Sequence, residues 1–192
     1  MKLISFLGAA TVALLALAAP ASAQTGQTEA RKIDDFVVRC LPVQNASPCD
    51  MYQEVGNTQT RQRLVTLSIS FMPSANRYIM VLSVPLGVLI ERGAVIETSG
   101  FTTEPMPIRR CDPGGCYVEA QAPQALIDGF RKASPQGKVK VVGDDDKPYE
   151  FNISFNGFSA AHDYMVAQNR AKATSAPATS AAAAAPAAPT AQ

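Results

Sequence analysis

Four cysteines are the residues of this 192-residue chain whose type and spacing most clearly suggest chemistry. They form two close pairs, Cys40 with Cys49 in "CLPVQNASPC" and Cys111 with Cys116 in "CDPGGC". Such pairs serve as disulfides, redox centres or metal ligands. A thioredoxin-like centre has two residues between its cysteines, whereas the shorter loop here holds four. A structural zinc needs four convergent thiolates, and the wide first spacing disfavours such a site.

The residues between the cysteines favour disulfides within each pair. Four cysteines allow three connectivities. Both loops are rich in turn-forming residues, and short loops close at the lowest entropic cost. We therefore predict the disulfides Cys40–Cys49 and Cys111–Cys116, each contributing about 2–3 kcal/mol to stability on the chain-entropy model.

The N-terminal residues predict an oxidising compartment for these cysteines. Residues 1–23 read "MKLISFLGAATVALLALAAPASA", with one cation, an apolar run, a proline and a small-residue triplet. These are the parts of a secretory signal peptide, with cleavage expected after Ala23. The mature protein is then periplasmic or secreted, where thiols are oxidised. No later run is long and apolar enough to span a bilayer, so we expect no stable membrane insertion.

The single histidine and an acidic cluster are the next candidates for chemistry. His162 lies on the apolar stripe of an expected helix, and no serine or cysteine nucleophile motif stands near it. We interpret it as a helix residue at the edge of the apolar face, with hydrogen bonds satisfied by water or backbone, rather than as a general base. Asp144, Asp145 and Asp146 are consecutive, whereas calcium loops place ligands at alternate positions. Consecutive aspartates between strands favour a solvated turn.

Arginines precede the second cysteine pair. Arg109 and Arg110 could bind an anionic sugar or a phosphate, although two surface arginines are a thin basis for a site. The chain has no phosphate loop, dinucleotide fingerprint or nucleophile motif. The sequence therefore predicts no catalytic residues, no metal and no cofactor, and it identifies no ligand-binding residue.

The charge balance excludes some partners. The chain has 17 Lys and Arg against 16 Asp and Glu, and loss of Lys2 with the signal leaves the mature chain formally neutral. A neutral chain has no electrostatic footprint for nucleic acid and no polybasic patch for lipid headgroups. We expect partners to be recruited by shape and local chemistry.

Composition divides the chain into four parts. Residues 1–23 are the signal peptide, residues 24–32 a flexible N-terminal segment, and residues 33–169 one folded domain. Residues 170–192 are rich in Ala and Pro and carry no large apolar side chain to bury. This composition predicts a disordered tail.

Most of the domain has the pattern of β-strands. Residues 63–72, "RLVTLSISFM", alternate between polar and apolar side chains, which is typical of a half-buried antiparallel strand. Further short strands are expected at 36–40, 51–55, 78–84, 116–121, 138–142 and 149–155, with a hairpin turn inside 88–98. Helices are expected at 123–133 and 157–169, the second with an apolar stripe of Phe158, Ala161, His162, Met165 and Val166. The fold class predicted is mainly β: an antiparallel, jelly-roll-like β-sandwich with one or two short helices.

Three stretches together resemble a known family. They are "VPLGVLIERGAVI", "IRRCDPGGCYVEA" and "ISFNGFSAAHDYM", in that order behind a signal peptide and an early cysteine pair. This pattern is similar to the invasion-associated locus B family of exported bacterial proteins, over roughly residues 34–166. One departure is Phe36 in a region where the family often has a tryptophan. The resemblance implies a β-rich, sandwich-like fold and an envelope or extracellular location, and it implies no catalytic residues.

These observations support one leading function and two alternatives. The leading hypothesis is an exported, non-catalytic interaction protein, associated with host-cell invasion or with the cell envelope. Its partner would be a protein of the envelope or of a host cell, whose identity the sequence does not reveal; nor does the sequence reveal the oligomeric state. The alternatives are a periplasmic small-ligand-binding protein and a thiol-redox enzyme.

Overall fold

The computed structural model describes residues 28–42 and 45–175. The expected signal peptide and the end of the expected tail lie outside these residues. The described chain forms ten strands, two α-helices and two 3-10 turns. They are β1 (Glu29–Ile33), β2 (Phe36–Cys40), β3 (Cys49–Gly56), β4 (Arg63–Met72), η1 (Pro73–Ala75), β5 (Arg77–Val84), η2 (Ile90–Arg92), β6 (Ala94–Thr98), β7 (Ile108–Asp112), β8 (Gly115–Ala122), α1 (Gln124–Lys132), β9 (Gln136–Val142), β10 (Pro148–Ser154) and α2 (Phe158–Ser175).

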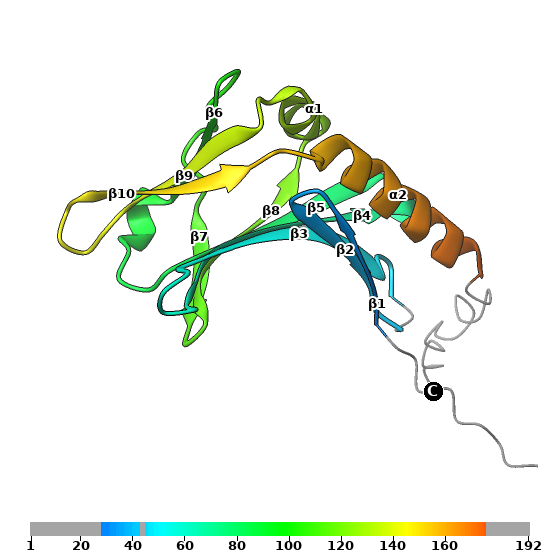
Figure 1. Ribbon diagram of the computed structural model, residues 1–192, viewed down its shortest axis with the longest axis horizontal. Coiled ribbons are helices and arrows are strands. Elements are labelled where there is room, and N and C mark those ends of the chain that lie inside the picture. The colour runs from blue at the N-terminus through cyan, green and yellow to red at the C-terminus, as the bar shows by residue number, and fades with distance from the viewer. Residues whose placement is uncertain (1–27, 43–44, 176–192) are drawn as a thin grey trace, which may run out of the picture.

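Seven strands form an arched antiparallel sheet (Figure 1). Their order is β1-β2-β3-β4-β5-β8-β7, so each of the first four strands pairs with the next in sequence. The alternation expected in residues 63–72 is present in β4, where Val65, Leu67, Ile69 and Phe71 are buried and the residues between them are partly exposed. One face of the sheet is thus apolar and the other polar.

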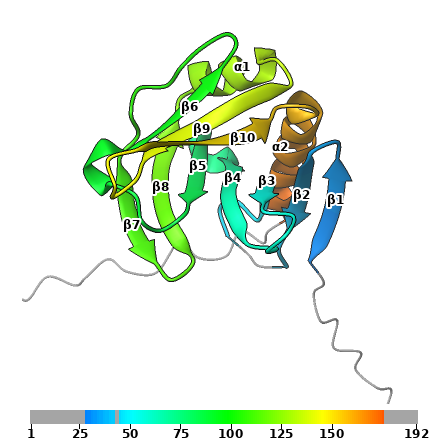
Figure 2. The same ribbon diagram turned by 60° about the vertical axis from the view of Figure 1, so that its left-hand side comes forward.

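A smaller sheet and the helices cover the apolar face. The smaller sheet has the order β10-β9-β6. It lies on the same side of the larger sheet as α2, as Figures 1 and 2 show together. Helix α2 contacts β2, β3 and β4, while β10 contacts β3. The polar face of the larger sheet carries no second layer within the described residues.

Aromatic side chains fill the junction of the layers. Phe130 of α1 packs against Phe155 and Phe158, with ring centroids 5.0 and 5.5 Å apart. Phe158 also meets the ring of Phe36 from β2, edge to face at 5.5 Å. The helix stripe expected at the start of α2 is buried. These rings connect both helices to both sheets.

The mainly antiparallel fold with two helices is confirmed. Strands β1 to β5 form a meander, and β5 then pairs with β8, because the chain crosses to β6 of the smaller sheet before it returns to the larger one. The hairpin expected within 88–98 does not form. Val88 instead bridges to Gly143, and β6 pairs with β9, because the chain crosses through η2 to the smaller sheet.

Two boundaries differ from those expected. Residues 29–32, assigned to a flexible segment, lie in β1, which pairs with β2 along its whole length. Arg31 of β1 also lies over the ring of Tyr164 at 4.6 Å. Helix α2 continues to Ser175, past the expected domain end at residue 169. Asn169, the last residue of the expected domain, fixes this part of the helix, because its buried side-chain amide bonds to the backbone N–H and C=O of Cys49, at 2.9 and 2.8 Å.

Candidate functional site

The polar face of the larger sheet contains a groove of about 440 Å³. Its floor comes from β4 and β5, where Thr66 lies opposite Ser83, Ser68 opposite Val81 and Ser70 opposite Ile79. A row of hydroxyl groups therefore runs beside a row of two apolar side chains and one hydroxyl. These residues line the polar face of the sheet, and Figure 1 shows no helix or strand of the described residues over the concave side of the arch.

A fixed ion pair forms one end of the groove. Arg39 donates two hydrogen bonds to Asp50, at 2.8 and 3.1 Å, and lies over the ring of Tyr52 at 4.6 Å. Ser68 donates a third bond to Asp50 at 2.9 Å. The hydrogen bonds to Asp50 raise the pKa of Arg39 further above its ordinary value. The Asp50 carboxylate is therefore held in one orientation beside the hydroxyl row.

A second arginine cluster lies by the other end. Arg110 of β7 bonds to Asp112 at 2.6 Å and to Glu119 at 2.8 Å, and its guanidinium lies 4.1 Å above the ring of Tyr117. The Tyr117 hydroxyl donates to Asp112 at 3.1 Å. The Asp112 pKa is lowered, first by the hydrogen bond from the Gly114 backbone. Tyr117 is thus fixed as the groove wall on this side.

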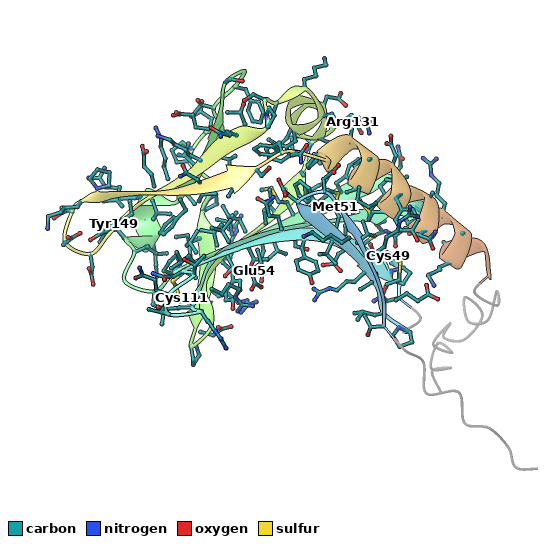
Figure 3. The ribbon with its side chains drawn as sticks, viewed as in Figure 1. Cys49, Met51, Glu54, Cys111, Arg131 and Tyr149 are labelled. Carbon is teal, nitrogen blue, oxygen red and sulfur yellow. A yellow bond between two sulfur atoms is a disulfide. The ribbon has the colours of Figure 1, made fainter. Side chains whose placement is uncertain are left out.

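The two disulfides brace these ends. Cys40–Cys49 joins β2 to β3 beside Arg39 and Asp50, and Cys111–Cys116 joins β7 to β8 beside Tyr117. Cys49 and Cys111 lie at opposite ends of the arch (Figure 3). Both bonds are the local pairings that the loop composition favours. Their position indicates that they hold the shape of the groove as well as adding stability.

Two polar groups at the groove are poorly satisfied. Arg63, with a side chain 48% exposed, has only a long 3.9 Å contact to Glu54 among the ion pairs of the described residues. The Thr66 hydroxyl oxygen has almost no accessible surface and no hydrogen-bond partner. Leaving such a group unpaired costs about 1–3 kcal/mol. The Arg63 guanidinium therefore remains available to a ligand, whereas the Thr66 hydroxyl is closed off in its present rotamer.

A second hollow, of about 710 Å³, lies between β3 and the smaller sheet. Its polar groups bond to one another: Gln53 accepts from the Ser154 backbone at 2.8 Å, and Ser154 donates its hydroxyl to Asp35 at 2.6 Å. Gln53 also donates to the Asp35 carbonyl at 3.3 Å. These bonds tie the two sheets together. The polar side chains of this hollow therefore have a structural role, and we do not assign a ligand to it.

His162 is buried at the junction of α1, α2 and β5. Its Nδ1 lies 2.6 Å from Arg131, and its Nε2 lies 3.0 Å from the Tyr78 hydroxyl. Because a guanidinium can only donate, Nδ1 accepts from Arg131 and Nε2 carries the proton toward Tyr78. Arg131, which is labelled in Figure 3, also forms an ion pair with Asp163. Both ring nitrogens are used, as expected of a helix residue with satisfied hydrogen bonds, but the partners are side chains rather than the water or backbone that were expected.

The burial of His162 predicts acid sensitivity. Burial lowers its pKa below the ordinary 6.5 and the Arg131 charge acts in the same direction, while the Asp163 carboxylate, 3.0 Å from Nδ1, opposes both because it would accept a hydrogen bond from the protonated ring. The unfolded chain therefore takes up a proton before the folded protein does, and stability falls as the pH falls below about 6.5. Urea midpoints at pH 7.5 and 5.5 measure this loss. His162→Asn, which cannot titrate, should show a smaller loss; an equal loss in both proteins would assign the acid sensitivity to other groups.

The other residues singled out in the sequence lie away from the groove floor. Asp144, Asp145 and Asp146 form the turn between β9 and β10, where the Asp145 side chain accepts from the Lys147 backbone and the Tyr149 hydroxyl, both at 3.1 Å. The expected solvated turn is confirmed. Arg109 lies at a bulge where β7 meets β8, and Arg110 is committed to its two carboxylates.

The described residues hold no candidate membrane-spanning helix and no candidate metal site. Among residues 28–42 and 45–175, no helix combines the length and apolar character needed to cross a bilayer. The same residues contain no group of three or more His, Cys, Asp or Glu side chains placed to hold a metal ion.

Sequence reasoning missed the groove as a site. The outward row of Thr66, Ser68 and Ser70 was recognised as one face of a strand, but Ile79 and Val81 stand in an almost continuous apolar run. Such a run favours a strand buried on both faces. The signal that could have revealed the groove is the alternation in β4. A strand that pairs with β4 must expose alternate side chains on the same face of the sheet.

Comparison with known proteins gives consistent matches. A family model described as "Invasion associated locus B (IalB) protein" matches residues 37–166. Invasion protein B homologs of Brucella abortus strain 2308 and of Brucella abortus biovar 1 strain 9-941 are each 23% identical over 163 residues, covering 85% of this chain and 92% of the relative. The crystal structure of invasion associated protein B from Bartonella henselae has a TM-score of 0.64 at 20% identity, covering 74% of this chain and 99% of that one.

Proposed function

The chain belongs to the invasion associated locus B family, and from this premise we propose that it is an exported, non-catalytic interaction protein. It acts in the periplasm or outside the cell after removal of residues 1–23. Its partner is a protein of the bacterial envelope or of a host-cell surface. The invasion-associated name of the relatives supports this role, and the family resemblance predicted from the sequence motifs is confirmed.

The groove on the polar face of the larger sheet is the observation that carries this proposal. It is open, it is flanked by arginine–tyrosine clusters, and a disulfide braces each end. A face held rigid in this way loses little conformational entropy when a partner binds. The non-catalytic assignment rests on His162, the single histidine of the chain, which is buried and bonded through both nitrogens.

Cross-linking of the mature protein to proteins of envelope and host-membrane fractions tests the proposal. The mature protein would be compared with Val81→Arg, which fills the groove from β5, and with Val95→Arg, a matched change on the smaller sheet. Both positions are partly exposed, so both variants should fold.

We expect one partner, identified by mass spectrometry, with the wild type and with Val95→Arg but not with Val81→Arg. Failure of the wild type to retain any specific partner would refute the interaction role. Retention by Val81→Arg would move the contact surface away from the groove.

A further inference from the structure

The groove floor is built from small side chains. Hydroxyl groups of Thr66, Ser68 and Ser70 on β4 face Ser83, Val81 and Ile79 on β5. The centres of protein–protein interfaces are depleted in serine, and their strongest contacts are large aromatic and arginine side chains in apolar pockets. This floor offers a protein side chain no deep apolar pocket.

A sugar ring matches the same floor. A pyranose carries hydroxyl groups around its edge and C–H groups on its faces. The hydroxyl row on β4 can exchange hydrogen bonds with the edge, while Ile79 and Val81 on β5 contact the C–H face. The groove volume of about 440 Å³ lies within the range of small-ligand sites. Its open form suits part of a chain rather than an enclosed small molecule.

The polar groups at the groove complete this match. Asp50 already accepts three hydrogen bonds, from Arg39 and Ser68, which fix its oxygens for a sugar hydroxyl. A carboxylate has about four acceptor positions, so capacity remains. Arg63 supplies donors that are only weakly paired. The Thr66 hydroxyl has no partner and almost no accessible surface, so it would have to change its χ1 rotamer to reach a ligand.

We infer that this groove binds a short segment of carbohydrate chain. The inference rests on the proposed function and specifies which part of the partner is seated in the groove: a glycan carried by the partner. Two sources share this chemistry, the glycans of a host surface protein and the glycans that a bacterial envelope protein carries, for which envelope polysaccharides serve as probes.

Glycan binding by the mature protein tests the inference. An array carrying bacterial envelope polysaccharides and animal glycans would be followed by titration of any hit, with NMR shifts mapping the site. The double variant Thr66→Val/Ser70→Ala removes two hydroxyl groups and keeps compact side chains. Thr102→Val, an exposed threonine beside β6, is the matched control.

We expect binding in at least one arm of the array, with shifts at the floor residues of β4 and β5. The double variant should bind about tenfold more weakly or worse, while Thr102→Val binds as the wild type does. The arm that responds identifies the source. A thermal melt controls for folding, and Thr66→Val should not lower stability because it removes an unpaired buried hydroxyl.

Two results would overturn the inference. One is the absence of binding to every glycan at millimolar concentration. The other is binding that the double variant leaves unchanged. Periodate oxidation of the partner's sugars separates this inference from the proposed function. Capture of the partner protein that survives oxidation would reject the carbohydrate ligand and keep the interaction role.

Discussion

Replacement of Phe158 by alanine is expected to lower the free energy of unfolding by about 3–5 kcal/mol. Phe158 is 1% exposed and is the first residue of α2. Its ring contacts Phe36, Phe130 and Phe155, with centroids at 5.5, 5.5 and 6.0 Å. The substitution therefore removes the ring that joins α2 to α1 and to both sheets, and the neighbouring rings, fixed on separate elements, cannot fully close the cavity.

Urea unfolding of the mature protein measures this loss. Tyr149→Ala is the control, because it removes an aromatic ring that is 45% exposed at the far end of β10 (Figure 3) and should cost about 0.5 kcal/mol or less. The dependence of the free energy on urea should stay unchanged in both variants. A loss below about 1 kcal/mol for Phe158→Ala would show that the core repacks around the cavity, contrary to this account.

Local patterns in the sequence predicted most of the elements. Residues 63–72 and 36–40 match β4 and β2 because alternation and β-branched side chains act within one strand. The helix at residue 158 was predicted because its apolar spacing is that of a helical face. β1 was missed because "EARKI" is almost wholly exposed, so it carries no alternation. Its stability comes from pairing with β2, which is a tertiary contact.

The groove could not be predicted because its parts come from different strands. Arg39 meets Asp50, and Arg110 meets Glu119, only after the registers of β2 with β3 and of β7 with β8 are set. The sequence predicts β5, but whether the Val81 side chain points to the core or to the polar face depends on its pairing with β4. The chemistry of this site is therefore a property of the sheet.

Removal of the Cys40–Cys49 disulfide is expected to cost about 3 kcal/mol, against about 2 kcal/mol for Cys111–Cys116. The first bond closes a loop with a separation of 9 residues and the second one of 5, so the first restricts the unfolded chain more. The environments differ in the same direction. Cys40 and Cys49 are 4% and 0% exposed, whereas Cys111 is exposed at the surface. In addition, Asn169 of α2 bonds to the Cys49 backbone, so movement of this hairpin also loosens the helix.

The paired variants Cys40→Ala/Cys49→Ala and Cys111→Ala/Cys116→Ala, unfolded in urea, test this order. A mild reductant applied to the folded wild type should open Cys111–Cys116 first, because the thiolate that attacks a disulfide needs access to its sulfur. Mass spectrometry of alkylated protein would then find label on Cys111 and Cys116 while the domain stays folded. Equal stability of the two variants would contradict the burial argument. Rapid reduction of Cys40–Cys49 in the folded protein would instead favour the thiol-redox alternative, because a disulfide that only stabilises the fold should stay closed until α2 and the β2–β3 hairpin separate.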